Sequence, residues 1–178
     1  MSRSDPQKKK RRFAKKTILV FGEGSNEAVF LKYLRGLYAR DTGFEVKILG
    51  GNGGSACDIV LDAGKVFGGY DRRVVVLDND KSESEMGDAR QAATVRGIEL
   101  IEHTPCLESV LLAILDDRGK SGDNVSDRHK SEFQSKYLEK KKRGELKEYE
   151  KLFPKSLLDV RRKKIKALDN LIGVIQGK

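Results

Sequence analysis

The feature that most constrains the fold is a regular alternation of apolar and amphipathic segments between residues 17 and 115. Short apolar stretches of β-forming residues are each followed by a segment with helical spacing or helix-forming composition. The predicted strands cover residues 17–21, 44–49, 73–77 and 98–101. This βαβαβαβα order predicts an α/β fold in which helices flank a mostly parallel four-stranded sheet.

The composition of the remaining segments divides the chain into four predicted parts. Residues 1–16 are polar and basic and predict a flexible arm, and residues 17–115 form the α/β domain. Residues 116–130 are rich in Asp, Gly, Ser and Asn, which predicts a mobile loop. Residues 131–178 predict a basic helical extension of two helices, separated near Pro154, whose last apolar residues can pack on the core.

Charge is distributed unevenly along the chain, which carries a formal net charge of +9. The middle is acidic, whereas the arm and the C-terminal segment are basic. This pattern favours a polyanionic partner for the flanks and a cation for the middle. For the charge alone, the favoured interpretation is that lysine-rich helices only keep the protein in solution.

The sequence also indicates the compartment. It contains no run of apolar residues long enough to span a membrane, so we expect no membrane partner. The basic N-terminus has no apolar stretch behind it and does not resemble a secretory signal. Cys57 and Cys106 are far apart and match no metal-binding motif, which predicts reduced thiols in the cytoplasm.

Acidic residues follow two of the predicted strands. Glu23 follows the first strand, Glu27 lies one helical turn further on, and Asp78 and Asp80 follow the third strand. Ligands of parallel α/β sheets bind beyond the carboxyl ends of the strands. Clustered carboxylates repel one another unless a cation or a raised pKa relieves them, and oxygen ligands suit Mg²⁺ or Mn²⁺.

Each of these acids also has a simpler interpretation. Glu27 can interact with the N-terminus of its helix, and the two aspartates can act as turn formers at a strand end. Lys81 can neutralise an oxyanion or can be an ordinary solvated lysine. The glycine-rich loop at residues 50–54 can hold a phosphate with its N–H groups, although a plain connection is the favoured interpretation.

The basic flanks supply the candidates for nucleic-acid binding, because phosphate neutralisation dominates the affinity of such complexes. They are Arg11, Arg12, Lys140, Lys141, Lys142, Arg161, Arg162, Lys163 and Lys164. Few aromatic residues lie near them, so base stacking is not indicated.

Three segments resemble the motifs of Toprim domains. Residues 22–27 (GEGSNE) resemble the glutamate motif in its E-G-x-T-E form, and residues 74–80 (VVVLDND) resemble the D-x-D strand. Residues 104–112 (TPCLESVLL) resemble the N-P-C-F-E-x-W-L-L segment of the RloB-like branch, to which the OLD-family nucleases are wider relatives. The resemblance covers roughly residues 11–115.

The resemblance implies a Toprim-like fold, dependence on Mg²⁺ and cleavage of phosphodiesters. It implies that Glu23 is a general acid or base and that Asp78 and Asp80 bind the metal. Glu108 either joins the metal ligands, which the resemblance favours, or interacts with the exposed N–H groups of its own helix. A partner protein such as an ATPase, and a role in a mobile-element or antiviral system, are also implied.

We therefore predict a divalent-metal-dependent nuclease that acts on DNA or RNA. The predicted catalytic residues are Glu23, Glu27, Asp78, Asp80 and Lys81, and the predicted metal ligands are Glu23, Asp78, Asp80 and Glu108. The alternative is a non-catalytic nucleic-acid-binding or regulatory Toprim subunit. A metal-dependent phosphotransferase or nucleotide-binding enzyme is a third possibility on the same fold.

Overall fold

The computed structural model describes residues 16–40, 42–116 and 125–178. The predicted basic arm, with Arg11 and Arg12, lies outside the described residues. The same holds for most of the predicted loop and for the side chain of Lys140.

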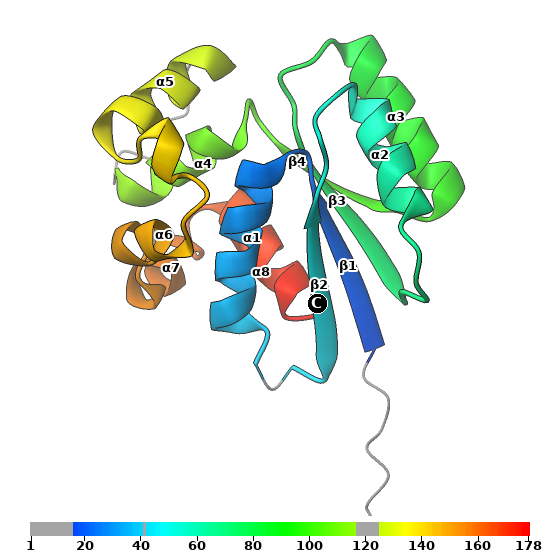
Figure 1. Ribbon diagram of the computed structural model, residues 1–178, viewed down its shortest axis with the longest axis horizontal. Coiled ribbons are helices and arrows are strands. Elements are labelled where there is room, and N and C mark those ends of the chain that lie inside the picture. Colours follow the sequence, from blue (N-terminus) through cyan, green and yellow to red (C-terminus); the bar gives the residue numbers. More distant parts are fainter. Residues whose placement is uncertain (1–15, 41, 117–124) are drawn as a thin grey trace, which may run out of the picture.

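A four-stranded, all-parallel sheet forms the centre of the molecule (Figure 1). The order across the sheet is β2-β1-β3-β4. The strands are β1 (Lys16–Gly22), β2 (Phe44–Gly50), β3 (Arg72–Asp78) and β4 (Glu99–His103). The predicted α/β fold with a parallel four-stranded sheet is therefore confirmed, and it is consistent with a Toprim-like fold.

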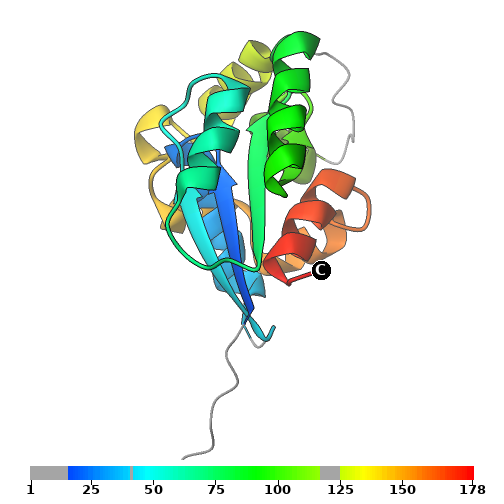
Figure 2. The same ribbon diagram turned by 90° about the vertical axis from the view of Figure 1, so that its right-hand side faces the viewer.

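Alternate residues of the strands pack on opposite faces of the sheet, as the two-residue period of a strand requires. On one face, Val74 and Val76 join a core with α1 (Ser25–Tyr38), α4 (Leu107–Leu115) and α8 (Lys166–Ile175). On the other face, Val75 and Leu77 pack against α2 (Ala56–Lys65) and α3 (Glu83–Arg96). Figure 2 looks onto α2 and α3, with the sheet behind them and α8 to one side.

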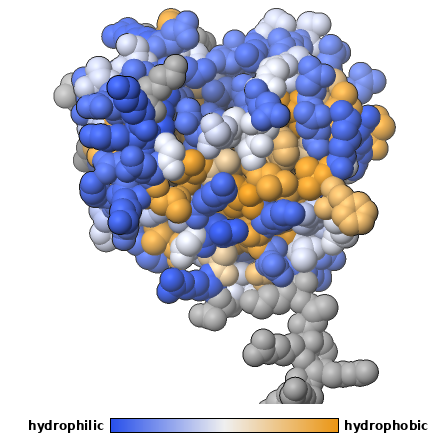
Figure 3. Space-filling model, viewed as in Figure 1, coloured by the Kyte–Doolittle hydropathy of each residue, from blue (hydrophilic) through white to orange (hydrophobic). Residues whose placement is uncertain are grey.

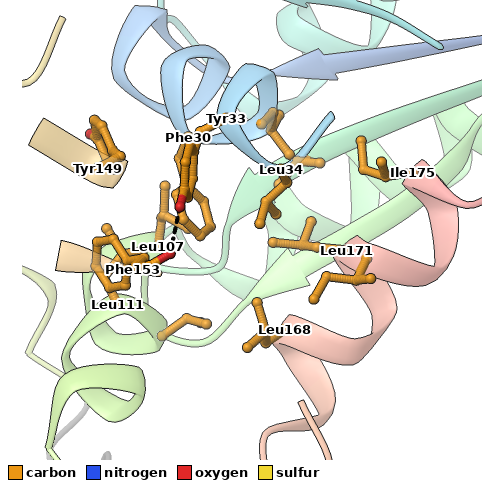
Figure 4. Close-up of a cluster of buried hydrophobic side chains, with 14 of the residues drawn as sticks. Phe30, Tyr33, Leu34, Leu107, Leu111, Tyr149, Phe153, Leu168, Leu171 and Ile175 are labelled. Carbon is orange, nitrogen blue, oxygen red and sulfur yellow. Dashed lines mark hydrogen bonds between the residues drawn. The ribbon is translucent and has the colours of Figure 1, made fainter. Parts of the chain in front are cut away.

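The C-terminal helices contribute to the first of these cores. They are α5 (Ser126–Lys136), the 3₁₀ segment η1 (Lys140–Lys142), α6 (Leu146–Leu152), α7 (Lys155–Arg161) and α8. Phe30 of α1 packs against Tyr149 and Phe153, with ring centroids 5.8 and 5.6 Å away (Figure 4). The Tyr33 hydroxyl donates a hydrogen bond of 2.5 Å to the Phe153 carbonyl.

Three local predictions were wrong. Residues 126–130 belong to α5 and not to a loop, because α5 buries His129 and Phe133. The sequence at residues 104–105 predicts a helix with Pro105 at its first position, but α4 starts after it, with Cys106 as its N-cap. The spacing of the apolar residues at 59, 63, 66 and 67 predicts a second helix that reaches Phe67, but α2 ends at Lys65 and Phe67 is 99% exposed.

Apolar side chains reach the surface in a band over the edge strand β2 and its neighbours, whereas the upper rim of this view is mostly hydrophilic (Figure 3). The carboxyl ends of the strands point toward that rim (Figure 1). In the part of the chain that the structure describes, no helix is both long and apolar enough to cross a bilayer.

Candidate functional site

The turn after β1 fixes Glu23 against the end of β3. The Glu23 backbone N–H donates to the Val76 carbonyl at 3.1 Å. The Glu23 carboxylate accepts a hydrogen bond from the Asp78 backbone N–H, also at 3.1 Å. The acids of the first and third strands therefore lie side by side, although 55 positions separate them.

The glycine-rich loop after β2 packs directly on this turn. The Gly51 and Gly53 N–H groups donate to the carbonyls of Gly22 and Glu23, at 2.9 and 3.3 Å. A Cβ atom on Gly51 would lie 2.7 Å from the Glu23 carbonyl oxygen, which is closer than a side chain permits. The loop thus needs glycine for this approach of two backbones.

A pocket of about 520 Å³ opens between these loops at the carboxyl ends of the strands. Its walls include the side chains of Glu23, Glu27, Asp78 and Glu108. Gly51, Asn52 and Gly53 form part of another wall, so the structure brings the glycine-rich loop to the site. Glu27 and Glu108 both lie in the first turns of their helices.

Burial and mutual repulsion disturb the carboxyl groups of this pocket. Burial, together with the charges of Glu27 and Glu23, raises the pKa of Asp78 to about 7. Burial also raises the pKa of Glu27, together with the charges of Glu108 and Glu23. The Asp78 Oδ1 atom accepts a hydrogen bond of 2.8 Å from the Leu107 N–H, which opposes the shift.

Glu108 has a buried carboxylate oxygen without a hydrogen-bond partner among the described residues. The residue is only 6% exposed, and its Oε2 atom has no hydrogen-bond partner among the described residues. Asp78, Cys106 and Glu108 offer ligand atoms that all lie within 4.8 Å of one another. Burial raises the pKa of Cys106 to about 11, so its sulfur is a protonated thiol that suits a hard cation poorly.

Two basic residues that the sequence did not single out complete the pocket. Lys130 Nζ lies 3.4 Å from Asp78 Oδ2 and 3.0 Å from Asp80 Oδ2. Arg143 Nη1 donates to Glu108 Oε1 at 3.1 Å, and Nη2 donates to the Lys130 carbonyl at 3.3 Å. Both residues line the pocket.

Asp80 and Lys81 lie beside the pocket. They are not among its lining residues, and Lys81 Nζ lies 3.8 Å from Asp80 Oδ1. Burial acts to raise the pKa of Asp80, but its polar neighbours Ser126 and Lys130 lower it overall. The structure therefore pairs Lys81 with Asp80, and it links Asp80 to the pocket acid Asp78 through Lys130.

The predicted nucleic-acid-binding residues fall into different settings. Lys141 and Lys142 are exposed and immediately precede the pocket residue Arg143. Lys163 and Lys164 are exposed in the turn between α7 and α8. The remaining two described arginines bind the protein itself: Arg161 Nε donates to Ile114 O at 2.9 Å, and Arg162 Nε donates to Asp169 Oδ1 at 2.8 Å.

Residues from all three Toprim-like motifs meet in this pocket, namely Glu23, Asp78 and Glu108. Comparisons with protein-family models, curated proteins and solved structures found no match for the chain. The resemblance to Toprim domains is therefore carried by the three motifs alone, and family membership stays a prediction.

Proposed function

We propose that this chain is a divalent-metal-dependent phosphodiesterase of the Toprim type, related to RloB-like and OLD-family nucleases, which cleaves DNA or RNA. The observation that carries the proposal is the convergence of four acidic side chains on one pocket, with a buried Glu108 oxygen that lacks a partner among the described residues. Lys130 pairs with Asp78 and Arg143 with Glu108, and a further cation would relieve the repulsion among the remaining carboxylate oxygens.

The donor atoms of the pocket fit Mg²⁺ or Mn²⁺. Glu23, Glu27, Asp78 and Glu108 supply carboxylate oxygens, which are the ligands that these ions prefer. Burial is the main cause of the raised pKa values of Asp78 and Glu27, and repulsion between the acids, which a divalent ion would relieve, adds to it. When bound, such an ion polarises a phosphodiester and stabilises the leaving oxygen.

The chain's own groups have separate roles in this proposal. Glu23 is held by the Asp78 N–H through Oε2, so we assign its other oxygen to accept or donate the proton of the reaction. Asn52 lines the pocket, and we assign it to a substrate phosphate, because the N–H groups of Gly51 and Gly53 already donate to the Gly22 and Glu23 carbonyls. Lys130 and Arg143 add positive charge to the same pocket and attract the phosphate into it.

Incubation with circular plasmid and with single-stranded RNA, in Mg²⁺, Mn²⁺ or EDTA, tests the proposal. We expect the wild type to cleave at least one polymer only when the divalent ion is present. Glu23→Gln keeps the shape but cannot transfer the proton, and we expect it to be about 100-fold slower or worse. The matched control is Glu45→Gln, an exposed position on β2, which should cleave at the wild-type rate. Equal rates for wild type and Glu23→Gln would contradict the proposal.

A non-catalytic nucleic-acid-binding or regulatory subunit is the second candidate. The observation in its favour is that the exposed Lys141 and Lys142 directly precede the pocket residue Arg143. Its signature is salt-dependent binding of nucleic acid that Asp78→Ala leaves unchanged, together with no cleavage. Either function is proposed for the cytoplasm, where the free thiols of Cys57 and Cys106 stay reduced.

A further inference from the structure

The positive charge of Lys130 bridges the carboxylates of Asp78 and Asp80. Its ammonium group is within 3.4 Å of Asp78 and 3.0 Å of Asp80, so one cation serves both carboxylates of the D-x-D motif. The Lys130 side chain is only 37% exposed. Its backbone carbonyl accepts a hydrogen bond from Arg143, which fixes α5 over the pocket.

The acids of the site differ in how their charge is balanced. Beside the pocket, Lys130 and Lys81 both lie within 4.0 Å of the Asp80 carboxylate, at 3.0 and 3.8 Å. Among the acids that line the pocket, Glu108 binds the cation of Arg143 through Oε1. Glu108 Oε2 is left without a partner among the residues that the structure describes.

We propose that Lys130 takes the place of a second metal ion, so that the site holds one divalent ion among Glu23, Glu27 and Glu108 and Asp80 is not a ligand. The inference rests on the proposed metal dependence. Its physical reason is that an ammonium group and a divalent ion repel each other when both approach the same aspartate pair. Lys130 thereby sets the number of metal ions.

Manganese binding to the full-length chain, measured by calorimetry and by the electron paramagnetic resonance signal of free Mn²⁺, tests this inference. We expect one ion per chain for the wild type. Lys130→Met keeps the length of the side chain and removes its charge. We expect this variant to bind two ions, or one ion roughly tenfold more tightly or better.

Three further variants make the test specific. Lys81→Met removes the other lysine next to Asp80 and should still bind one ion with wild-type affinity. Adding Asp80→Asn to Lys130→Met should abolish the second site or the gain in affinity. Lys130→Gln repeats the test with a polar side chain if the methionine variant fails to fold, which circular dichroism reveals.

The outcomes separate the two proposals. Two ions in the wild type, or identical binding by the wild type and the Lys130 variants, would overturn the inference and leave the metal-dependent function standing. A wild type that binds no Mn²⁺ would overturn both. One ion in the wild type with a gain in Lys130→Met supports both.

Discussion

Asp78 is the residue on which the charge balance of the pocket depends most. It is 4% exposed, it donates its backbone N–H to Glu23, and its carboxylate accepts from the Leu107 N–H while facing Lys130. Burial, with the charges of Glu27 and Glu23, holds its pKa at about 7, above the ordinary value of 3.8. The folded protein therefore binds a proton at this site that the unfolded chain releases.

The raised pKa of Asp78 predicts a specific pH dependence of stability. Between about pH 4 and pH 7 the folded state holds the proton and the unfolded state does not, so stability falls as pH rises. Above about pH 7 the loss is complete. At pH 8 we expect Asp78→Asn to unfold at a higher denaturant concentration than the wild type. Its free energy of unfolding should be larger by about a few kcal/mol at most. Urea titrations without divalent ions at pH 5 and pH 8 measure the difference.

Asp80 provides the matched control, because its folded pKa is lowered and not raised. Its contribution to stability is present above the unfolded pKa and disappears as pH falls through the folded value. Asp80→Asn should therefore be less stable than the wild type at pH 8. A loss of stability in Asp78→Asn at pH 8 as large as that in Asp80→Asn would show that the pocket acids are not mutually repelled.

The sequence located the pocket acids because their positions follow from the strand pattern. The carboxyl ends of parallel strands meet at one edge of the sheet, so Glu23 and Asp78 had to lie near one another. Lys130 and Arg143 could not be located in this way. One lies where composition indicated a loop and the other ends a run of basic residues, and only the packing of α5 and η1 brings them to the pocket.

At the scale of elements, the site depends on two turns that touch through their backbones. The turn between β1 and α1 carries Glu23, and the loop after β2 lies against it. Gly50 and Gly51 permit this approach, since a Cβ atom on either would lie within 2.8 Å of a backbone oxygen of the first turn. The glycines after β2 therefore position an acid that belongs to another strand.

Gly51→Ala tests this dependence. The added methyl group would meet the Glu23 carbonyl oxygen at 2.7 Å, so the turn must move and overpacking should lower the free energy of unfolding by about 1–3 kcal/mol. Gly87→Ala is the control: a methyl group on Gly87, within α3, would have nothing within 4 Å of it, and the change should stabilise the helix by about 0.5–1 kcal/mol. Denaturant unfolding measures both, and equal effects of the two substitutions would exclude a steric role for Gly51.

The strands could be predicted from the sequence more reliably than the C-terminal helices, because the two kinds of element differ in how many residues they bury. Central parallel strands are buried on both faces and form continuous apolar runs, as in residues 74–77. The segment from α5 to α7 buries only a few side chains per helix, among them Phe133, Tyr149 and Leu158. So few buried positions give a weak helical period, and two helices were predicted where the structure has α5, η1, α6, α7 and α8.

At the scale of the whole molecule, the α/β part and the C-terminal helices share one core. Phe153 is fully buried and contacts the rings of Phe30, Phe133 and Tyr149. Its carbonyl accepts the hydrogen bond from Tyr33. Side chains of the first and last thirds of the chain therefore stabilise each other directly (Figure 4).

This shared core predicts that the described part of the chain unfolds in a single step. Phe153→Ala should lower the free energy of unfolding by about 3–5 kcal/mol and should shift the whole transition. Far-ultraviolet circular dichroism and tyrosine fluorescence, followed in the same urea titration, should give coincident curves. Two separate transitions, with only one of them shifted by Phe153→Ala, would indicate that the C-terminal helices fold independently. Val160→Ala, at an exposed position of α7, is the control and should change stability little.

The same core has a consequence for how the protein matures on the ribosome. Tyr33 and its acceptor at Phe153 are 120 positions apart. At roughly 5–20 residues per second, the segment that packs on α1 is therefore synthesised on the order of ten seconds after α1. During that interval the nascent chain exposes the apolar face of α1, and it carries its acidic cluster before Lys130 and Arg143 have been synthesised. The emerging chain therefore exposes this apolar surface until Phe153 has been synthesised, and the pocket acids gain their basic partners only when Lys130 and Arg143 follow them.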